Sequence, residues 1–160
     1  MSNIKDKYFS DLETSVTAIE DKVDGTDATV TAYRREYGIP QIMEFGITAA
    51  ANAGDTTVAT ITAQPCMIES ITIYANAAQT ADMTSCAVEG GTGQVVEFIG
   101  AATAIQASLD AADKQVSWTG AVRLAATKTI TIDLQGTGAT AVDLTVSVKY
   151  RACVDGGYLV

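Results

Sequence analysis

Residues 128–151, KTITIDLQGTGATAVDLTVSVKYR, contain two stretches in which apolar and polar side chains alternate strictly. In the first stretch, Ile130, Ile132 and Leu134 lie on one side of an extended chain, and the polar residues lie on the other. In the second, apolar residues occupy every second position from Val142 to Tyr150. This pattern predicts two β-strands, each with one buried face, joined by the loop GTGATA.

The chain from residue 41 onward repeats this pattern in short segments separated by loops rich in Gly, Asn and Asp. Short strands at regular spacing predict an all-β fold, either a β-sandwich or a jelly roll. The segment 101–113 also fits a turn of helix, and this alternative is left open. The predicted strands are 42–49, 56–63, 67–75, 84–89, 94–99, 104–109, 115–124, 128–135 and 142–152.

The strand 115–124 contains the single tryptophan of the chain, Trp118, on its apolar face. We expect Trp118 to anchor the core, because a large aromatic side chain on the buried face of a strand contributes much of the buried area. Gly120 follows two residues later and predicts a bend or a bulge in this strand.

Residues 1–40 differ from the rest of the chain and form a predicted N-terminal arm. Apolar residues recur there every three or four positions, which predicts an amphipathic helix that ends near the pair Asp24 and Gly25. The segment 26–37 fits either a second short helix or an extended chain. The apolar stripe must pack on something, either its own domain or neighbouring copies, and both remain open. The stripe consists of Ile4, Tyr8, Leu12, Val16, Ile19 and Val23.

The domain organisation that follows is an arm (1–40), a sandwich (41–152) and a tail (153–160). The tail ends in Tyr158, Leu159 and Val160, which are apolar at a position where chains usually fray. We expect these three residues either to add a last strand at the edge of the core or to dock on a neighbouring chain.

Charge and hydropathy exclude several partners. The formal net charge is −9, from 19 acidic and 10 basic residues, so we expect no nucleic-acid partner. No apolar segment reaches the roughly 18 residues that span a bilayer, so we expect no membrane partner. The first ten residues lack the apolar core of a signal peptide, which favours assembly in a cytoplasm.

Residues for catalysis or metal binding are scarce, and we expect no catalytic residues, cofactor or metal. The chain has no histidine, which removes the usual general base and the commonest ligand of transition metals. Asp110 and Asp113 are interpreted as a solvated turn rather than an acid/base pair. The glycine loops 90–94 and 136–140 lack the Lys-Ser or Lys-Thr of a phosphate loop and are interpreted as hairpin turns.

Two further groups were weighed as metal or redox sites. Cys66, Cys86 and Cys153 show no CxxC spacing and are interpreted as small buried residues, with one disulfide left open in an oxidising setting. The acidic residues of DKVDGTD, at 21–27, lack the ligand spacing of an EF-hand and are interpreted as the end of the arm helix.

An arm, a jelly-roll-like body rich in Ala and Thr, and an apolar tail together resemble the capsid decoration or cement proteins of tailed bacteriophages and related viruses. The stretches that carry this resemblance are PCMIESITIYANAA (65–78), GQVVEFIG (93–100), QVSWTGAVRLAATKTITIDL (115–134) and LTVSVKYRA (144–152).

The resemblance implies a structural protein on the capsid surface of the virion, with the major capsid protein and further copies of itself, in a homotrimer, as partners. It implies that the arm clamps neighbouring capsomers. The implied contact residues are Ile4, Tyr8, Leu12, Val16, Ile19, Val23, Tyr33 and Tyr37 of the arm and Tyr158, Leu159 and Val160 of the tail.

Two alternatives belong to other classes of protein. The first is a receptor- or glycan-binding module of a viral tail or fibre, with the arm helix driving trimerisation and the loops 76–82 and 90–93 carrying recognition. The second, a hydrolase or isomerase on a jelly-roll scaffold, is disfavoured because the usual bases and ligands are absent.

Overall fold

A computed structural model describes residues 38–160, which form two antiparallel sheets and two short 3-10 helices. The predicted arm helix and the segment 26–37 lie outside the described residues. The strands are β1 (Pro40–Ile47), β2 (Gly54–Thr62), β3 (Cys66–Ala75), β4 (Met83–Gly90), β5 (Val96–Ile105), β6 (Gln115–Leu124), β7 (Thr129–Gly136), β8 (Leu144–Ala152) and β9 (Tyr158–Leu159); the 3-10 helices are η1 (Thr92–Gln94) and η2 (Gln106–Ser108).

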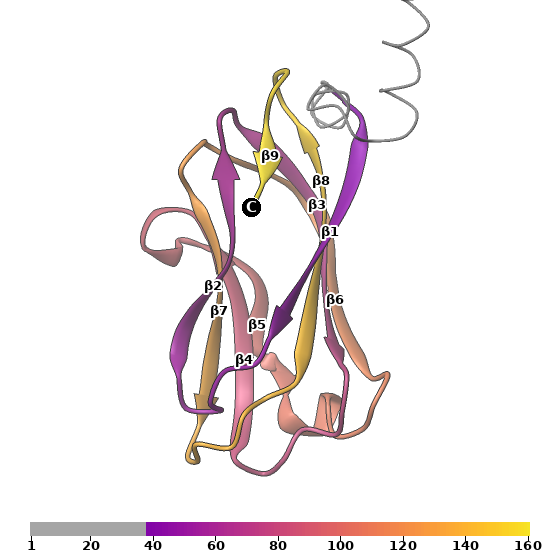
Figure 1. Cartoon of the computed structure of the whole chain (residues 1–160), viewed down its shortest axis with the longest axis vertical. Helices are drawn as coiled ribbons and strands as arrows, with labels where there is room; N and C mark the ends of the chain where they lie inside the picture. The colour runs from indigo at the N-terminus through magenta and orange to yellow at the C-terminus, as the bar shows by residue number, and fades with distance from the viewer. Residues whose placement is uncertain (1–37) are drawn as a thin grey trace, which may run out of the picture.

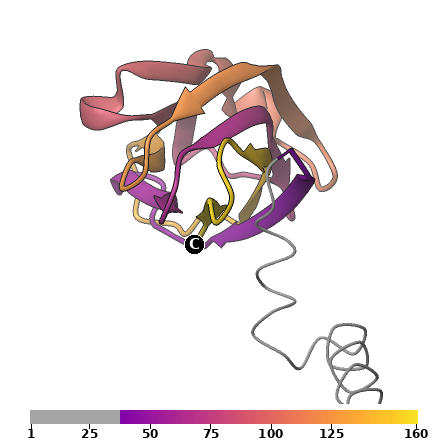
Figure 2. The same cartoon turned by 90° about the horizontal axis from the view of Figure 1, so that it is seen from above.

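The strand order identifies the fold as a jelly roll. One sheet has the order β1-β8-β3-β6 and the other the order β5-β4-β7-β2-β9. Among the first eight strands, β1 pairs with β8, β2 with β7, β3 with β6 and β4 with β5. This nested pairing is that of a long antiparallel ribbon rolled up so that its two halves face each other (Figures 1 and 2). The all-β prediction is confirmed.

The core lies between the two sheets and is built from the alternation that the sequence displays. In β8, Leu144, Val146 and Val148 are fully buried, and the intervening Thr, Ser and Lys face outward. The Tyr150 hydroxyl is buried too, and it donates a hydrogen bond to Oε1 of Gln41 across the β1–β8 pair, at 2.9 Å. Each large apolar side chain removed from water in this way stabilises the fold by about 1.5–3 kcal/mol.

Gly120 confirms the expected bulge in the strand 115–124, whereas Trp118 is only partly buried and packs against the core without belonging to it. The register of the β3–β6 pair shifts between Ile68 and Ser70, which places a bulge beside Gly120. The indole of Trp118 packs against the core and meets Phe98 edge-on, with ring centroids 4.9 Å apart. A Cβ at position 120 would lie 2.4 Å from this indole, so the ring occupies the space that glycine leaves.

Two predicted strands, 94–99 and 104–109, are wrong in their bounds. A single strand, β5, runs from Val96 to Ile105, and residues 106–108 form the turn of helix η2 that the sequence left open. Ala104 is fully buried opposite Cys86 of β4, and Ile99 lies opposite Val88, so the register shifts across the small residues 100–103 while β5 continues as one strand.

The interpretation of the glycine loops is confirmed for 90–94 and wrong for 136–140. Gly91 and Gly93 adopt positive φ angles of 90° and 62° in the β4–β5 hairpin. In contrast, residues 136–140 lead from β7 to β8, which belong to different sheets. Gly136 has no positive φ; a Cβ there would lie 2.2 Å from the carbonyl oxygen of Asp82. Close backbone approach, which local sequence does not reveal, therefore requires this glycine.

The tail forms strand β9 at the edge of the five-stranded sheet. Tyr158 and Leu159 pair with Thr62 and Ile61 of β2, and Leu159 is buried. Val160 and Thr60 exchange two backbone hydrogen bonds of 2.7 and 3.1 Å, while the Val160 side chain is exposed. The first of the two alternatives, a last strand over the core, is the arrangement observed, and a contact of the tail with another chain stays a prediction.

Candidate interaction surface

The outer face of the β1-β8-β3-β6 sheet carries the groups most suited to contact a partner. Strands β3 and β6 present short polar side chains there, such as Thr72 and Ser117, whose hydroxyls are 3.0 Å apart. Glu69 of β3 forms ion pairs with Arg151, at 2.5 Å, and with Lys149, at 3.4 Å. These contacts stiffen the middle of the face, and two hollows lie toward its opposite ends.

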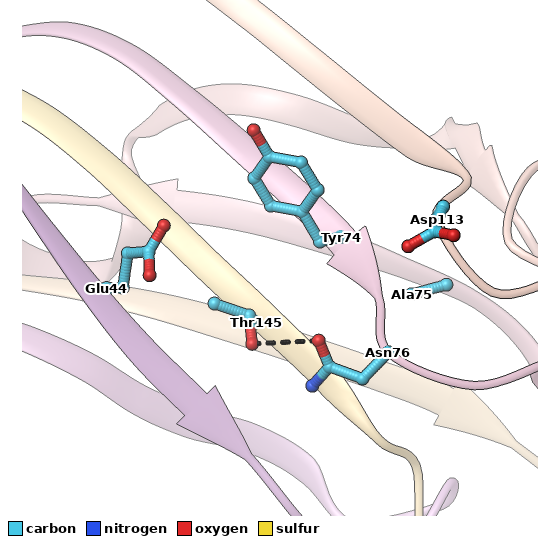
Figure 3. Close-up of a pocket in the computed structure, with 6 residues that line it drawn as sticks. All are labelled: Glu44, Tyr74, Ala75, Asn76, Asp113 and Thr145. Atoms are coloured by element: carbon cyan, nitrogen blue, oxygen red, sulfur yellow. Dashed lines mark hydrogen bonds between the residues drawn. The ribbon is translucent and has the colours of Figure 1, made fainter.

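The first hollow, called the acidic hollow below, has a volume of about 200 Å³. Glu44 comes from β1, Thr145 from β8 and Tyr74 from β3, so the strands that supply them are adjacent in the sheet. Asp113 comes from the loop before β6 (Figure 3). The complete lining is Glu44, Tyr74, Ala75, Asn76, Asp113 and Thr145.

Hydrogen bonds hold the floor of the acidic hollow in place. The Thr145 hydroxyl donates to Oδ1 of Asn76, at 3.1 Å (Figure 3), and Nδ2 of Asn76 donates to Oδ1 of Asp143, at 2.9 Å. The amide of Asn76 is therefore fixed on both sides. The carboxylates of Glu44 and Asp113 lie on either side of the Tyr74 ring (Figure 3), and within residues 38–160 neither carboxylate has a hydrogen-bond or ion-pair partner.

The second hollow, called the arginine hollow below, has a volume of about 580 Å³ and lies where the arm joins the body. Arg123, Met67 and Arg151 are neighbours in one row across β6, β3 and β8. Nη1 of Arg151 also donates to the carbonyl oxygen of Gly38, at 3.2 Å, which ties the start of the described chain to the sheet. The lining is Gly38, Met67, Arg123, Arg151, Ala152 and Cys153.

Strand β1 lies at one edge of this sheet and carries exposed apolar side chains. It pairs with β8 on one side only, and its other edge is not covered by another strand of the described residues. Ile42 is 65% exposed, and Ile39 and Met43 are 39% and 37% exposed. These three residues, called the β1 apolar edge below, lie where the arm meets the sandwich in the sequence, with Ile42 on the outer face of the sheet and Met43 on the inner face.

The outer face of the other sheet is acidic. Glu89 of β4 lies directly opposite Glu97 of β5, and Asp133 and Asp55 lie on the neighbouring strands β7 and β2. Partial burial raises the pKa of Glu89 above its usual value, and the charges of Asp133, Asp55 and Glu97 raise it further. Within residues 38–160, no group of three or more Cys, Asp or Glu side chains is arranged to hold a metal ion.

The sequence-predicted site residues fall in three places. The arm residues lie outside the described part, and the tail residues lie in β9. Asp110 forms an ion pair with Lys114 on the surface, as expected for a solvated turn. Between β1 and β9, the structure describes no helix long and apolar enough to cross a membrane.

Sequence reasoning missed the acidic hollow, although one signal was available. Tyr74 is out of phase with Ile71 and Ile73, so its ring must face outward from β3, where it is 37% exposed. An aromatic residue on the polar face of a strand, next to a loop, is the pattern to look for.

No known protein family matches the sequence, and no characterised protein is similar to it in sequence. Three structures of phage capsids contain chains with a similar fold. A chain of the cyanophage Pam1 capsid asymmetric unit is 15% identical, with a TM-score of 0.49 over 71% of this chain and 85% of that one.

A chain of the Ralstonia phage GP4 capsid is 11% identical, with a TM-score of 0.46 over 72% of this chain and 86% of that one. A chain of the acid-stable capsid of Helicobacter pylori bacteriophage KHP30 is 13% identical, with a TM-score of 0.44 over 76% of this chain and 98% of that one. Likeness of this extent concerns the fold alone.

Proposed function

We propose that this protein is a structural component of a virion, which binds the outer capsid surface and links neighbouring capsomers through residues 1–40. The major capsid protein and further copies of the same chain are its proposed partners, and a homotrimer its proposed state. One observation carries the proposal, namely the β1 apolar edge of Ile39, Ile42 and Met43. Covering Ile42 alone would contribute about 1.5–3 kcal/mol.

The position of the β1 apolar edge connects it with the arm. It begins one residue after Gly38, where the described chain starts, and the apolar stripe of residues 4–23 precedes it in the sequence. A strand edge with apolar side chains is a template for association, and proteins usually protect such edges. An arm and an edge that act together would bury one continuous apolar surface against the capsid.

The test is binding of the full-length protein to capsids stripped of it, measured by co-sedimentation. Two variants address the proposal: Leu12→Asp with Val16→Asp in the arm, and Ile39→Ser with Ile42→Ser in β1. We expect each pair to reduce binding at least tenfold. Val95→Ser is the control, because Val95 is 78% exposed in the β4–β5 turn, away from β1. Stoichiometric binding by both variants would refute the role of the arm and the edge.

A receptor- or glycan-binding module is the second candidate function. The observation that favours it is the exposed ring of Tyr74, with carboxylates beside it that can accept hydrogen bonds from sugar hydroxyls. Asn76, which belongs to the predicted recognition loop 76–82, lines the same hollow. Binding on a glycan array that Tyr74→Ala abolishes would support this candidate, and absence of binding to any glycan would remove it.

A further inference from the structure

We propose that the acidic hollow is the receptor for Arg34 and Arg35 of a second copy of this chain. This inference rests on the proposed function, in which the arm contacts neighbouring molecules, and it names one partner of the arm and the place where it binds. It follows from the charge of the hollow, from its shape and from the reach of the chain.

The charge of the hollow calls for a cation from outside the described body. Glu44 and Asp113 contribute two carboxylates, and none of the six lining residues is basic. The nearest base in sequence, Lys114, is already held by Asp110 and by the carbonyl oxygen of Ala107. The bases Lys149 and Arg151 on the same sheet are paired with Glu69. A guanidinium group would compensate the two free carboxylates.

The shape of the hollow suits a planar guanidinium better than a compact ammonium group. An arginine can stack on the face of a tyrosine while its nitrogen atoms donate to carboxylates at its edge. The ring of Tyr74 lies between the two carboxylates in Figure 3. Gly46, the strand partner of Thr145, leaves open space beside the floor, since a Cβ there would meet no atom within 4 Å.

Arg34 and Arg35 are the one pair of consecutive basic residues in the sequence. Their own subunit cannot place them in the hollow. Gly46 lies in one row across the sheet with Thr145 and Tyr74 of the hollow, and it follows Gly38 by eight residues, which is about 26 Å along an extended strand. Arg34 precedes Gly38 by four residues, which span at most about 14 Å. The remaining gap exceeds the length of an arginine side chain, so the pair must come from another copy.

A contact between the arm of one copy and the body of the next is heterologous, because the two surfaces differ. Such contacts propagate from copy to copy and form a closed ring when the rotation between copies permits it. Each subunit then gives one arm and receives one. The homotrimer implied by the sequence resemblance is a ring of this kind.

The experiment measures self-association of full-length variants by sedimentation equilibrium at about 50 mM and about 500 mM NaCl, which differ strongly in screening. The arm variant is Arg34→Glu with Arg35→Glu. The hollow variant is Glu44→Arg with Asp113→Asn, where asparagine suits the positive φ of residue 113. We expect each variant to associate at least tenfold more weakly than the wild type. The protein carrying all four changes should associate more tightly than either of the two variants, because a pair of acidic arm residues then faces a hollow with a net positive charge.

Matched controls separate this contact from general charge effects. Lys5→Glu with Lys7→Glu makes the same charge change elsewhere in the arm. Glu97→Arg with Asp55→Asn makes the same change as the hollow variant on the opposite sheet. Both controls should associate like the wild type. Gly46→Leu blocks the hollow without altering charge, and it should weaken association like the hollow variant.

Three results would overturn the inference. The first is a wild type that is monomeric at both salt concentrations, and the second is self-association that the hollow variant and Gly46→Leu leave unchanged. The third is a glycan that occupies the hollow and does not compete with self-association. Capsid binding, measured in parallel, is a separate readout. Association that follows the charge pattern without capsid binding would refute the proposed function and keep this inference. Capsid binding together with self-association that the charge changes leave unaltered would refute this inference and keep the proposed function.

Discussion

Gly46 and Gly136 both lie in strands, yet an added methyl group would meet very different surroundings. A Cβ at Gly136 would lie 2.2 Å from the carbonyl oxygen of Asp82 and 2.7 Å from that of Ala51. At Gly46 it would meet nothing within 4 Å. Backbone oxygens cannot move without moving the main chain of the loops that carry them, so the two glycines differ in what they contribute to folding.

We therefore predict that Gly136→Ala lowers the free energy of unfolding by about 2–3 kcal/mol, as overpacking against a rigid backbone does. Gly46→Ala should change it by less than about 0.5 kcal/mol. Urea denaturation of both full-length variants measures the difference. Equal effects would mean that the β7–β8 connection does not pass this close to residues 51 and 82.

The buried thiol of Cys86 gives a prediction with a definite sign. Burial, and to a smaller extent the charge of Asp133, raises the pKa of Cys86 to about 12. An unfolded thiol titrates near pH 8.5, so above that value the unfolded state releases a proton that the folded state keeps. The contribution of Cys86 to stability is therefore complete below about pH 8.5 and is lost as pH rises toward 12.

The free energy of unfolding of the Cys86→Ala variant should therefore fall less steeply than that of the wild type between about pH 8 and about pH 10. The two slopes should differ by up to roughly 1.4 kcal/mol per pH unit. Urea denaturation across this range measures the two slopes. Cys153→Ala is the control at a partly exposed thiol and should follow the wild type. Parallel slopes for the wild type and Cys86→Ala would contradict the prediction.

Sheet pairing brings like charges together on β4, β5 and β7. Glu89 lies directly opposite Glu97, and Asp133 lies on the strand at its other side. Because the raised pKa of Glu89 means that the folded state binds its proton more tightly, ionisation of Glu89 destabilises the fold. Stability from this group therefore increases as pH falls from the raised pKa to the unfolded value near 4.3.

From this sign we expect Glu89→Gln to stabilise the protein at pH 7 by roughly 0.5 kcal/mol, the size of a cross-strand like-charge pair. The gain should vanish below about pH 4.3, where the carboxyl is protonated in both states. Thermal melts at neutral and acidic pH measure it. A gain of equal size at both would show that the effect is not electrostatic.

Strand β9 closes the edge of the five-stranded sheet with two residues. Leu159 is 2% exposed and belongs to the core, while Val160 is 59% exposed. Leu159→Ala should therefore cost about 2–3 kcal/mol of stability, and Val160→Ala less than about 0.5 kcal/mol. Urea denaturation provides the test. A neutral Leu159→Ala would mean that the tail leaves its own sheet, as docking on another chain requires.

At the scale of the whole molecule, the rolled ribbon separates two surfaces of different charge. The outer face with Glu89, Glu97, Asp55 and Asp133 is acidic, and the opposite sheet carries the paired bases, the two hollows and the β1 apolar edge. Partners that cover apolar and mixed-charge surfaces would meet the second sheet. The arm joins the body on that same side, at Gly38.

The buried core of the described residues begins at Ile47, and Gly38 is hydrogen-bonded to Ala152 and Arg151. We predict that a chain starting at Gly38 unfolds cooperatively within about 5 °C of the full-length protein, which for this size corresponds to roughly 1–2 kcal/mol. Differential scanning calorimetry of both proteins provides the comparison. Loss of the cooperative transition would mean that the arm is part of the folding unit.

The sequence by itself determined the all-β class and most of the strands with their buried faces, because alternation is a local property that each strand displays alone, but it divided β5 into two strands. It also located the Gly120 bulge beside Trp118. Only the tertiary structure decided that the strands nest as a jelly roll, that Gly136 is needed for a close approach, and that the tail belongs to β2. These features depend on residues far apart in the chain. The acidic hollow is the clearest case, since Glu44, Tyr74 and Asp113 meet only when three strands and a loop are brought together.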